Sequence, residues 1–350
     1  TRNDCGRHSH LSFSMKFFAS KFVRRLALFV GGVLLAALLG AGWIYLKMRG
    51  SLAQLDGDAV VVGLGDAVEV ERDTLGVPTI TGQSRIDVAR ARGWLHGQER
   101  FFQMDLLRRR AAGELSELFG PKALDADKSA RLHGFRKTAQ ENIARLAVGE
   151  RDLLEAYVAG VNAGREALGG APFEYTLLRS APREWLVEDS MLVVYAMAME
   201  LHEVGTYERS LSVLRLIYGT EVTRFFAPLM TESDAALDGT VAEGVGLIPP
   251  ASVIDVPAIE STVTIVKDIT SRSDPVRSGS NSFSLSGEHT ASGVPMLAND
   301  MHLFLRAPNA WYRASLKWRD DNAVYGVTGV TLPGLPLVVA GSNGAIAWGF

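Results

Sequence analysis

The hydrophobic pattern shows one long apolar run near the start of the chain, which differs from the mixed apolar and polar pattern of the residues after it. Residues 26–46 carry no charged side chain. The run is preceded by four basic residues, Lys16, Lys21, Arg24 and Arg25. At about 1.5 Å per residue, a helix of this length crosses the roughly 30 Å hydrocarbon core of a bilayer. We therefore expect a transmembrane or signal-anchor helix over 26–47. Residues 1–25 then form a cytoplasmic N-terminal segment, because flanking positive charges favour that side.

A cleaved signal peptide is the alternative interpretation of this run. Such peptides have a shorter apolar region that ends at small residues, and 36–38 and 40–42 are candidate cleavage sites. With the anchor retained, the chain is held in the inner membrane with its remainder in the periplasm; with cleavage, the remainder is secreted to the periplasm. Because Met15 stands directly before the basic and apolar stretch, we expect residues 1–14 not to be native coding sequence. Without them the chain loses Cys5, its only cysteine, and can form no disulfide or cysteine metal site.

The periodicity downstream predicts a mainly helical region and then a strand-rich one. Alternation predicts strands at 59–70 and 78–81, and helical spacing predicts helices. The predicted helices cover 86–119, 130–146, 150–167, 187–203 and 208–218. In the first of these, we expect Arg108, Arg109 and Arg110 to form a solvated or salt-bridged face. Residues 239–279 are rich in Pro, Ser, Thr and Val without a helical period, which predicts a linker.

Alternation resumes after the linker and predicts a β-hairpin that begins at Ser280, with a turn at 288–293. The pattern as a whole indicates an α+β protein. With 350 residues and 47% hydrophobic composition, the chain can bury a substantial core. Its net charge of -3 gives no sign of a nucleic-acid-binding surface.

The most informative chemistry lies at Gly279, Ser280 and Asn281. A serine hydroxyl is a poor nucleophile near neutral pH and needs a base to take its proton. A free α-amine, with a pKa of about 7.7–8.0, is a suitable base, so a serine at a new chain terminus supplies both groups. By itself the triplet also fits an ordinary turn, because Gly, Ser and Asn are common turn residues.

Two blocks of motifs change the interpretation of this triplet. The upstream block contains Val68 to Asp73, Gly76-Val77-Pro78, His96-Gly97-Gln98-Glu99-Arg100, Phe102-Gln103-Met104, Arg108 and Gly113-Glu114-Leu115. The downstream block contains Gly279 to Phe283, Asn299 to His302, Trp311-Tyr312, Gly329 to Pro336 and Gly341 to Gly349. In order and spacing, these motifs resemble the penicillin acylase family of N-terminal-nucleophile hydrolases, which includes penicillin, cephalosporin and acyl-homoserine-lactone acylases. The resemblance extends from about Val68 to Phe350.

The resemblance implies a self-cleaving precursor with a four-layer αββα sandwich, incomplete here, in which Ser280 opens a central strand of two stacked antiparallel sheets. Residues 55–240 would be the α-chain region, and 241–279 a spacer removed on maturation. Residues 280–350 would be the truncated start of the β-chain. Cleavage between Gly279 and Ser280, through an ester formed by an N-to-O shift, would give an α/β heterodimer.

The resemblance also implies roles for particular residues. Ser280 would be the nucleophile, with Ser278 and Ser282 as local rivals, and its own amine would be the base. His302 lies 22 residues further on and matches a polar site beside the nucleophile that is His or Gln in the family. A hydrogen-bonded core histidine is the alternative. Asn299 and Asp300 are expected to serve the turn that positions His302.

The binding sites implied by the family are less specific. The acyl pocket matches Met197, Leu201, Leu303, Ala340 and Phe350, for which ordinary core packing is the alternative. Glu208 matches a carboxylate that binds structural Ca²⁺, an ion that takes six to eight oxygen ligands. Its other ligands are missing, so a surface charge is the alternative. No cofactor is expected for catalysis. The oxyanion-hole residues would lie beyond Phe350, so we expect no turnover from this fragment alone.

These inferences lead to an exported N-terminal-serine amidohydrolase that cleaves an acyl amide through an acyl-enzyme. The candidate substrates are N-acyl-homoserine lactones and β-lactam side-chain amides, and His302 leans toward the lactone type. The alternative is a membrane-anchored binding or scaffold protein of the same fold that never matures. A triad hydrolase and a zinc hydrolase are disfavoured, because Ser280 and Ser342 lack the Gly-x-Ser-x-Gly motif and His202-Glu203 does not begin an HExxH motif.

Overall fold

The computed structural model describes residues 12–202, 205–228, 238–239, 248–250, 252, 280–303, 305–320 and 323–350. Side chains are described from residue 21 onward. Cys5, Gly279 and nearly all of the predicted spacer therefore lie outside the described residues. The chain divides into two compact units, one formed by Thr1–Ala196 and Leu305–Phe350 and the other by Met197–Phe304.

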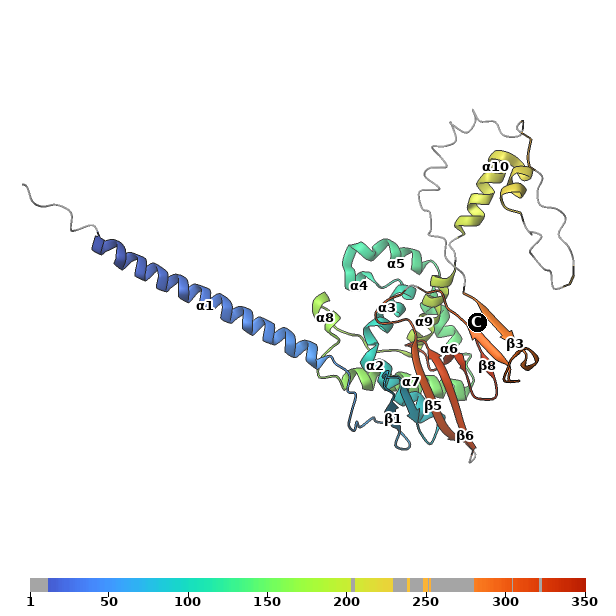
Figure 1. The fold of residues 1–350 in the computed structure, drawn as a ribbon, viewed down its shortest axis with the longest axis horizontal. Coiled ribbons are helices and arrows are strands. Elements are labelled where there is room, and N and C mark those ends of the chain that lie inside the picture. The colour runs from blue at the N-terminus through green and yellow to red at the C-terminus, as the bar shows by residue number, and fades with distance from the viewer. Residues whose placement is uncertain are drawn as a thin grey trace, which may run out of the picture. The chain divides into compact units, whose positions relative to one another are not determined.

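Helices form most of the first part of the chain, and strands form most of the last part (Figure 1). The helices are α1 (Ser12–Gly50), α2 (Arg85–Glu99), α3 (Phe101–Ala112), α4 (Ser116–Phe119), η1 (Gly120–Ala123), α5 (Leu124–Arg131), α6 (Phe135–Ile143), α7 (Val148–Glu166), α8 (Phe173–Leu178), α9 (Val187–Leu201), α10 (Thr206–Phe226) and η3 (Gly287–His289). The strands are β1 (Glu69–Arg72), β2 (Pro78–Thr81), β3 (Ser282–Leu285), β4 (Met296–Asn299), β5 (Tyr312–Asp320), β6 (Ala323–Thr331), β7 (Val338–Ser342) and β8 (Ala347–Trp348).

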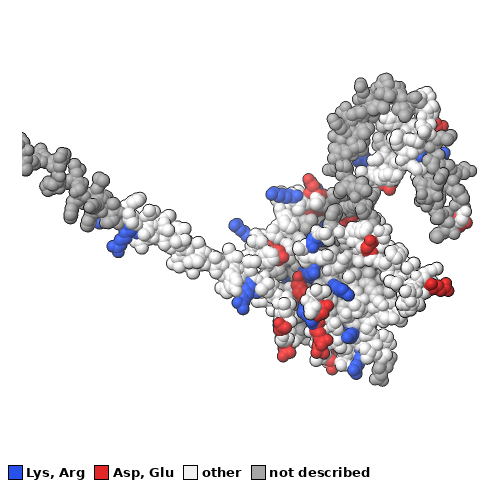
Figure 2. All heavy atoms as spheres, in the orientation of Figure 1, with Lys and Arg blue, Asp and Glu red and all other residues white. Residues whose placement is uncertain are grey.

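Helix α1 confirms the helix expected over 26–47 and extends it at both ends. Within it, Lys21–Gly50 is long and apolar enough to cross a membrane, with a mean hydropathy of 2.2 over its most apolar stretch and none of that stretch buried. Figure 2 shows the helix as a largely uncharged stretch that has basic residues near its ends. A signal sequence has the same length and composition, so both interpretations of the run stay open.

Six strands form one sheet in the order β1-β2-β5-β6-β7-β8. All neighbours are antiparallel except β2 and β5, which run parallel with Ile80 opposite Leu316. Strands from before and after residues 241–279 thus share one hydrogen-bonded ladder. Two stacked antiparallel sheets were expected, but the described residues form this one mixed sheet and a separate β3-β4 hairpin.

The core lies between the sheet and helix α2. Ile80 and Leu316 from the sheet pack with Val88, Trp94 and Leu95 from α2, and all five side chains are buried. On its other side α2 lies directly against α7. A Cβ atom on Gly93 would be 2.1 Å from the Tyr157 carbonyl oxygen, which shows that the two backbones touch.

Gly93→Ala is expected to destabilise the protein. The new methyl group would overlap the α7 backbone, and overpacking of this kind typically costs about 1–3 kcal/mol. Gly149→Ala is the matched control, because Gly149 lies in the first turn of α7 and a Cβ atom added there would have no atom outside its own turn of helix within 4 Å. Urea unfolding followed by circular dichroism would measure both variants. If Gly93→Ala were no less stable than Gly149→Ala, the close packing of α2 on α7 would be wrong.

The strand predicted over 59–70 is wrong except for its last two residues, which belong to β1. Its backbone groups bond to side chains of α2 instead of a neighbouring strand. The Gly65 N–H donates to Asp87 Oδ1 at 2.7 Å, and the Val62 carbonyl accepts from Arg90 at 3.2 Å. Gly63, at φ 87°, takes a left-handed turn that a strand does not accommodate. The strand predicted at 78–81 is confirmed as β2.

Two of the predicted helices are interrupted. The helix expected over 86–119 is divided at Arg100, whose φ is −136°, and at Gly113, which ends α3 in the left-handed conformation. The helix expected over 130–146 is divided at Gly134, with φ 62°. The helices expected over 150–167 and 187–203 are confirmed as α7 and α9 within a few residues at each end. The helix expected over 208–218 continues to Phe226 across a kink at Gly219.

The solvated interpretation of the Arg108 to Arg110 run is wrong for its first two members. Arg108 and Arg109 are each 1% exposed, and both pair with the buried carboxylate of Asp105. Arg108 also pairs with Asp189, and Arg109 pairs with Glu117. The salt-bridged interpretation is therefore confirmed for these two residues, inside the protein and not on its surface.

Candidate active site

The predicted hairpin after the linker is confirmed. Strands β3 and β4 pair antiparallel, with Ser282 opposite Asn299 and Leu285 opposite Met296. In the connecting loop, Gly293 takes a positive φ of 71° and its carbonyl oxygen approaches Gly287 so closely that only a glycine fits there. Strand β3 starts at Ser282, so Ser280 precedes the strand, and among the described residues β3 pairs only with β4. The expectation that Ser280 opens a central strand is therefore not met in the described part of the chain.

The hairpin brings the Ser280 hydroxyl to the residues that follow β4. The backbone N–H of His302 donates to Ser280 Oγ at 3.1 Å. Between this contact and the paired strands, the Asp300 N–H donates to the Asn281 carbonyl at 3.0 Å. The side chain of Asn299 donates to the same carbonyl at 3.2 Å. Ser280 and His302, the two predicted catalytic residues, are thus held together by hydrogen bonds that continue the pairing of β3 with β4 beyond the ends of the strands.

The imidazole of His302 pairs with Asp300. His302 Nε2 lies 2.9 Å from Asp300 Oδ2, while Asp300 Oδ1 accepts the Asn281 N–H at 2.6 Å. His302 is 39% exposed, so it does not lie in the core of the described residues. Asp300 was expected to serve a turn, but among the described residues it bonds across the hairpin to Asn281, and its contact with the imidazole was missed from the sequence. The signal was the Asp-x-His spacing at the end of a strand.

The Asp300 carboxylate is stabilised in its charged form. The Asn281 N–H and then the His302 imidazole lower the pKa of Asp300 below its usual range. The contact therefore contributes above the ordinary carboxyl pKa of about 3.9 and is lost as the pH falls through the lowered value. At the pH values of about 5 to 8 where proteins are usually most stable, the carboxylate stays charged and available to orient its two partners.

The five residues assigned to the acyl pocket are divided between the two compact units. Met197, Leu201 and Leu303 belong to one unit, and Ala340 and Phe350 belong to the other. Met197 is buried, which agrees with its alternative of core packing, while Leu201 is 54% exposed. The assignment of these five residues to a pocket stays a prediction.

Glu208 is exposed in the first turn of α10. Among the described residues no group of three or more His, Cys, Asp or Glu side chains gathers into a metal site. The calcium role of Glu208 therefore stays a prediction as well.

The upstream motif residues join the region before the spacer to the region after it. His96 Nδ1 lies 2.7 Å from the Tyr157 hydroxyl, which accepts the Gly334 N–H at 2.9 Å. Thr331 Oγ1 donates to the Tyr312 carbonyl, so it accepts from His96 Nε2 at 3.4 Å, and the Tyr157 hydroxyl donates to Nδ1. Burial, together with two nearby arginines, lowers the pKa of His96 well below its usual value, so the ring is neutral.

Two further motif residues make contacts of the same kind. The Tyr312 hydroxyl donates to Glu99 Oε2 at 3.1 Å, and Glu99 also pairs with Arg72. Arg100 donates to the Asn309 carbonyl at 2.7 Å. The sequence alone gave these residues no role. Their contacts fasten β5 and the segment before it to α2.

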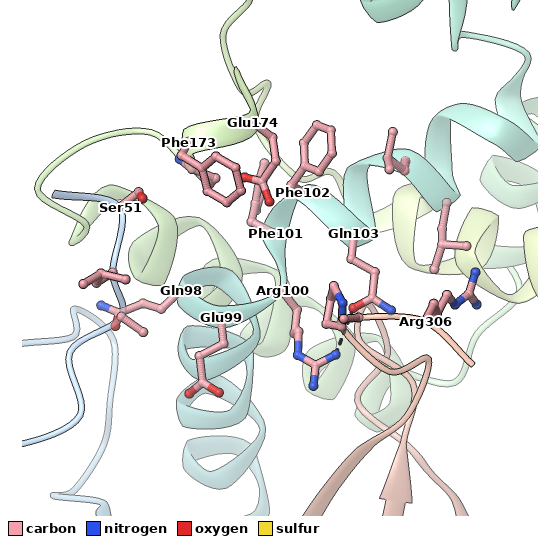
Figure 3. Close-up of a pocket in the computed structure, with 17 residues that line it drawn as sticks. Ser51, Gln98, Glu99, Arg100, Phe101, Phe102, Gln103, Phe173, Glu174 and Arg306 are labelled. Atoms are coloured by element: carbon pink, nitrogen blue, oxygen red, sulfur yellow. Dashed lines mark hydrogen bonds between the residues drawn. The ribbon is translucent and has the colours of Figure 1, made fainter. Parts of the chain in front are cut away.

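A cavity of about 640 Å³ lies in the unit that contains α1, and Figure 3 draws the residues that line it. Phe102, Phe173 and Leu52 line it together with Arg100 and Glu174. None of the five residues predicted for the acyl pocket lines this cavity. It is therefore a second feature of the molecule, separate from the predicted acyl pocket.

Comparison with known proteins supports the motif resemblance. The chain is 28% identical to penicillin acylase 2 proenzyme of Pseudomonas sp. strain SE83 over 298 residues, covering 83% of this chain and 36% of that protein. It is also 28% identical to the acyl-homoserine lactone acylase QuiP of Pseudomonas aeruginosa over 327 residues, covering 91% of this chain and 37% of that protein. The chain thus spans little more than a third of the length of these curated relatives.

Among solved structures, a thermostable penicillin G acylase from Alcaligenes faecalis in a tetragonal form matches 51% of this chain and 98% of that chain. The sequence identity is 26% and the TM-score is 0.41. The family model described as penicillin amidase matches residues 67–350, which is most of the chain. The chain therefore belongs to the penicillin amidase family.

Proposed function

We propose that the polypeptide containing this chain is an exported, self-cleaving N-terminal-serine amidohydrolase. The observation that carries the proposal is the hydrogen bond from the His302 N–H to Ser280 Oγ. It fixes the hydroxyl of the residue that the family motif assigns as nucleophile. Family membership and relatives named as acylases support the reaction class.

In the proposed maturation, Ser280 Oγ attacks the carbonyl carbon of residue 279. The C–N bond breaks, the acyl group passes to oxygen, and the nitrogen takes up the hydroxyl proton. Water then hydrolyses the ester, which leaves a carboxylate on residue 279 and a free amine on Ser280. In the mature enzyme this amine accepts the proton as Oγ attacks the substrate amide. The amine product leaves with that proton, and water releases the acid from the acyl-enzyme.

The two chains would stay together as an α/β heterodimer. The β2-β5 ladder joins one side of the spacer to the other, and the contacts of Glu99 with Tyr312 and of Tyr157 with Gly334 reinforce it. Buried apolar side chains from both sides share one core. A backbone cut at 279/280 removes none of these contacts.

The proposed substrates are N-acyl-homoserine lactones or amides of β-lactam side chains. One relative is named as a penicillin acylase and another as an acyl-homoserine lactone acylase. The test is the release of primary amine from an N-acyl-homoserine lactone and from penicillin G by the purified complete polypeptide. Release from either substrate supports the proposal. A correctly cleaved protein that releases amine from neither would contradict the substrate assignment.

We also propose that α1 anchors the enzyme in the inner membrane, with the catalytic part in the periplasm. The apolar stretch Lys21–Gly50 supports this location. A carbonate wash separates anchored from released protein: retention in the membrane supports the anchor, and loss to the supernatant supports signal cleavage. Residues 241–279 are the proposed spacer, and Glu208 is the proposed structural calcium ligand.

Asp300→Ala is expected to slow self-cleavage and amide hydrolysis by about tenfold, because the carboxylate orients both the backbone next to Ser280 and the imidazole of His302. The substitution removes the acceptor for both Asn281 and His302. Asp300→Asn keeps an acceptor for Asn281 and should have a smaller effect. Glu288→Ala, in η3 of the same hairpin, is the control. Rates of fragment appearance on gels measure the first reaction, and wild-type rates in Asp300→Ala would refute this positioning role.

A further inference from the structure

The C-terminal end of α1 and the residues that follow it contact the rest of the unit beside the cavity drawn in Figure 3. A Cβ atom on Gly50, the last residue of α1, would lie 3.2 Å from the Gly169 carbonyl oxygen. The Gln54 N–H donates to Gln98 Oε1 at 2.8 Å. Between these two attachments, Ser51, Leu52 and Ala53 line the cavity. The cavity therefore lies at the point where the chain would leave the membrane.

Connectivity limits how far this region can be from the lipid. The apolar run ends at Leu46, and Gly50 follows it by one helical turn, about 6 Å along the helix. Leu52 comes two residues later. The headgroup regions add roughly 10–15 Å in total to the hydrocarbon core, about half of it at each face. Gly50 thus lies within the interfacial layer at one face, and Leu52 lies at the outer edge of that layer and moves into it when α1 tilts.

The rim of the cavity carries exposed apolar side chains. Leu52 is 70% exposed, and Phe173 is 41% exposed. Leu177 is 74% exposed and lies one turn after Phe173 on the same face of α8. In Figure 3, Phe173 stands on the side of the cavity toward Ser51, and Phe102 stands further from Ser51. Leu52 and Phe173 thus expose apolar surface at the cavity next to the end of α1, and Leu177 adds to it on the same face of α8; we call these three side chains the apolar patch.

Charged residues around this patch suit a membrane surface. Lys47 and Arg49 lie in the last turn of α1, and Arg306 lines the cavity on the far side from Ser51 (Figure 3). Glu174 is the acidic residue beside Phe173. Basic side chains flanking exposed aromatic and aliphatic ones are typical of surfaces that lie in the interfacial layer of anionic bilayers.

We propose that Leu52, Phe173 and Leu177 insert into the interfacial layer of the bilayer that α1 spans, so that the cavity opens onto lipid. The inference rests on the proposed membrane anchor, and it does not depend on acylase activity. The body would then be held against the membrane by two attachments, the helix and this patch. An amphiphile dissolved in the bilayer could enter the cavity without crossing water.

The test places one fluorescent label at a time on the complete polypeptide. In a background without other cysteines, which within this chain requires only Cys5→Ser, the label goes on Phe173→Cys, Leu132→Cys or Leu38→Cys. Leu132 is 88% exposed in the turn after α5, and it is not among the residues that line the cavity. Leu38 lies in the middle of the apolar run and is 70% exposed. Each protein is placed in phosphatidylcholine and phosphatidylglycerol vesicles with and without lipids that carry a nitroxide quencher.

The label at 173 is expected to lose about half of its emission to a quencher at headgroup depth, because interfacial side chains sit roughly 5–10 Å into the boundary. The label at 132 should lose almost none, and the label at 38 should be quenched by a deeper nitroxide. Quenching at 38 without quenching at 173 would overturn the docking surface alone. Quenching at neither position would overturn the anchor together with it. A blue shift at 173 without nitroxide quenching would assign the patch to a protein contact and also overturn the proposal.

Discussion

Ser280→Ala is expected to abolish both self-cleavage and amide hydrolysis in the complete polypeptide. Both reactions begin with the same oxygen, and the hydrogen bond from His302 holds that oxygen in place. Loss of an activated serine nucleophile lowers kcat on the order of 10⁶-fold. Denaturing gels would follow the first reaction and an amine-release assay the second. The variant should accumulate as an uncleaved precursor.

Two neighbouring serines provide the matched controls. Ser282→Ala changes the first residue of β3, whose side chain is exposed, and Ser278→Ala changes a residue that lies outside the described part of the chain. Both variants should mature and turn over close to the wild-type rate. If Ser280→Ala still cleaved itself while one of the controls did not, the nucleophile would have to be reassigned to that serine.

The second large effect is expected on stability, at Asp105. Its carboxylate is fully buried and accepts from Arg108 at 2.7 Å, from Arg109 at 2.9 Å and from the Tyr175 hydroxyl at 2.6 Å. Burial alone would raise the pKa of Asp105, but the two guanidinium groups and the hydroxyl outweigh it and lower that pKa. Asp105→Ala leaves two buried guanidinium groups without this partner, which costs about 3–5 kcal/mol.

Urea unfolding of the full chain in detergent would measure this loss. Asp125→Ala is the control, because the ion pair of Asp125 with Lys128 is exposed, and such pairs contribute about 0–1 kcal/mol. The lowered pKa of Asp105 also predicts that wild-type stability falls as the pH drops below about 4. Asp105→Asn should weaken that dependence. A loss below about 1 kcal/mol in Asp105→Ala would contradict the description of the cluster as a buried, mutually satisfied network.

The local hydrophobic pattern was sufficient to predict those helices and strands whose bounds are set by residues close together in the sequence. Strand β2 has the predicted bounds, and α9 begins where predicted. The segment 59–70 looked like a strand because its alternation is real, but its partners are Asp87 and Arg90, more than 20 residues away. The end of α3 at Gly113 had a readable signal, a glycine followed by Glu-Leu. The break at Arg100 had none.

The same distinction holds for the site. The motif placed Ser280 and His302 together, and the hairpin alternation explains how they meet. That the backbone of His302 holds Ser280, while its ring pairs with Asp300, depends on the register of β3 and β4, which a sequence does not reveal. The burial of Arg108 depends on Asp189, 81 positions later. The features that the sequence did not predict are those that depend on partners far away along the chain.

The central claim, that Ser280 becomes an N-terminal nucleophile, is tested most directly by intact-mass measurement of the complete polypeptide after expression. We predict two chains, the second of which begins at Ser280. A single uncleaved chain would contradict this claim and favour a scaffold of the same fold, and a new N-terminus at any other residue would contradict the assignment of Ser280.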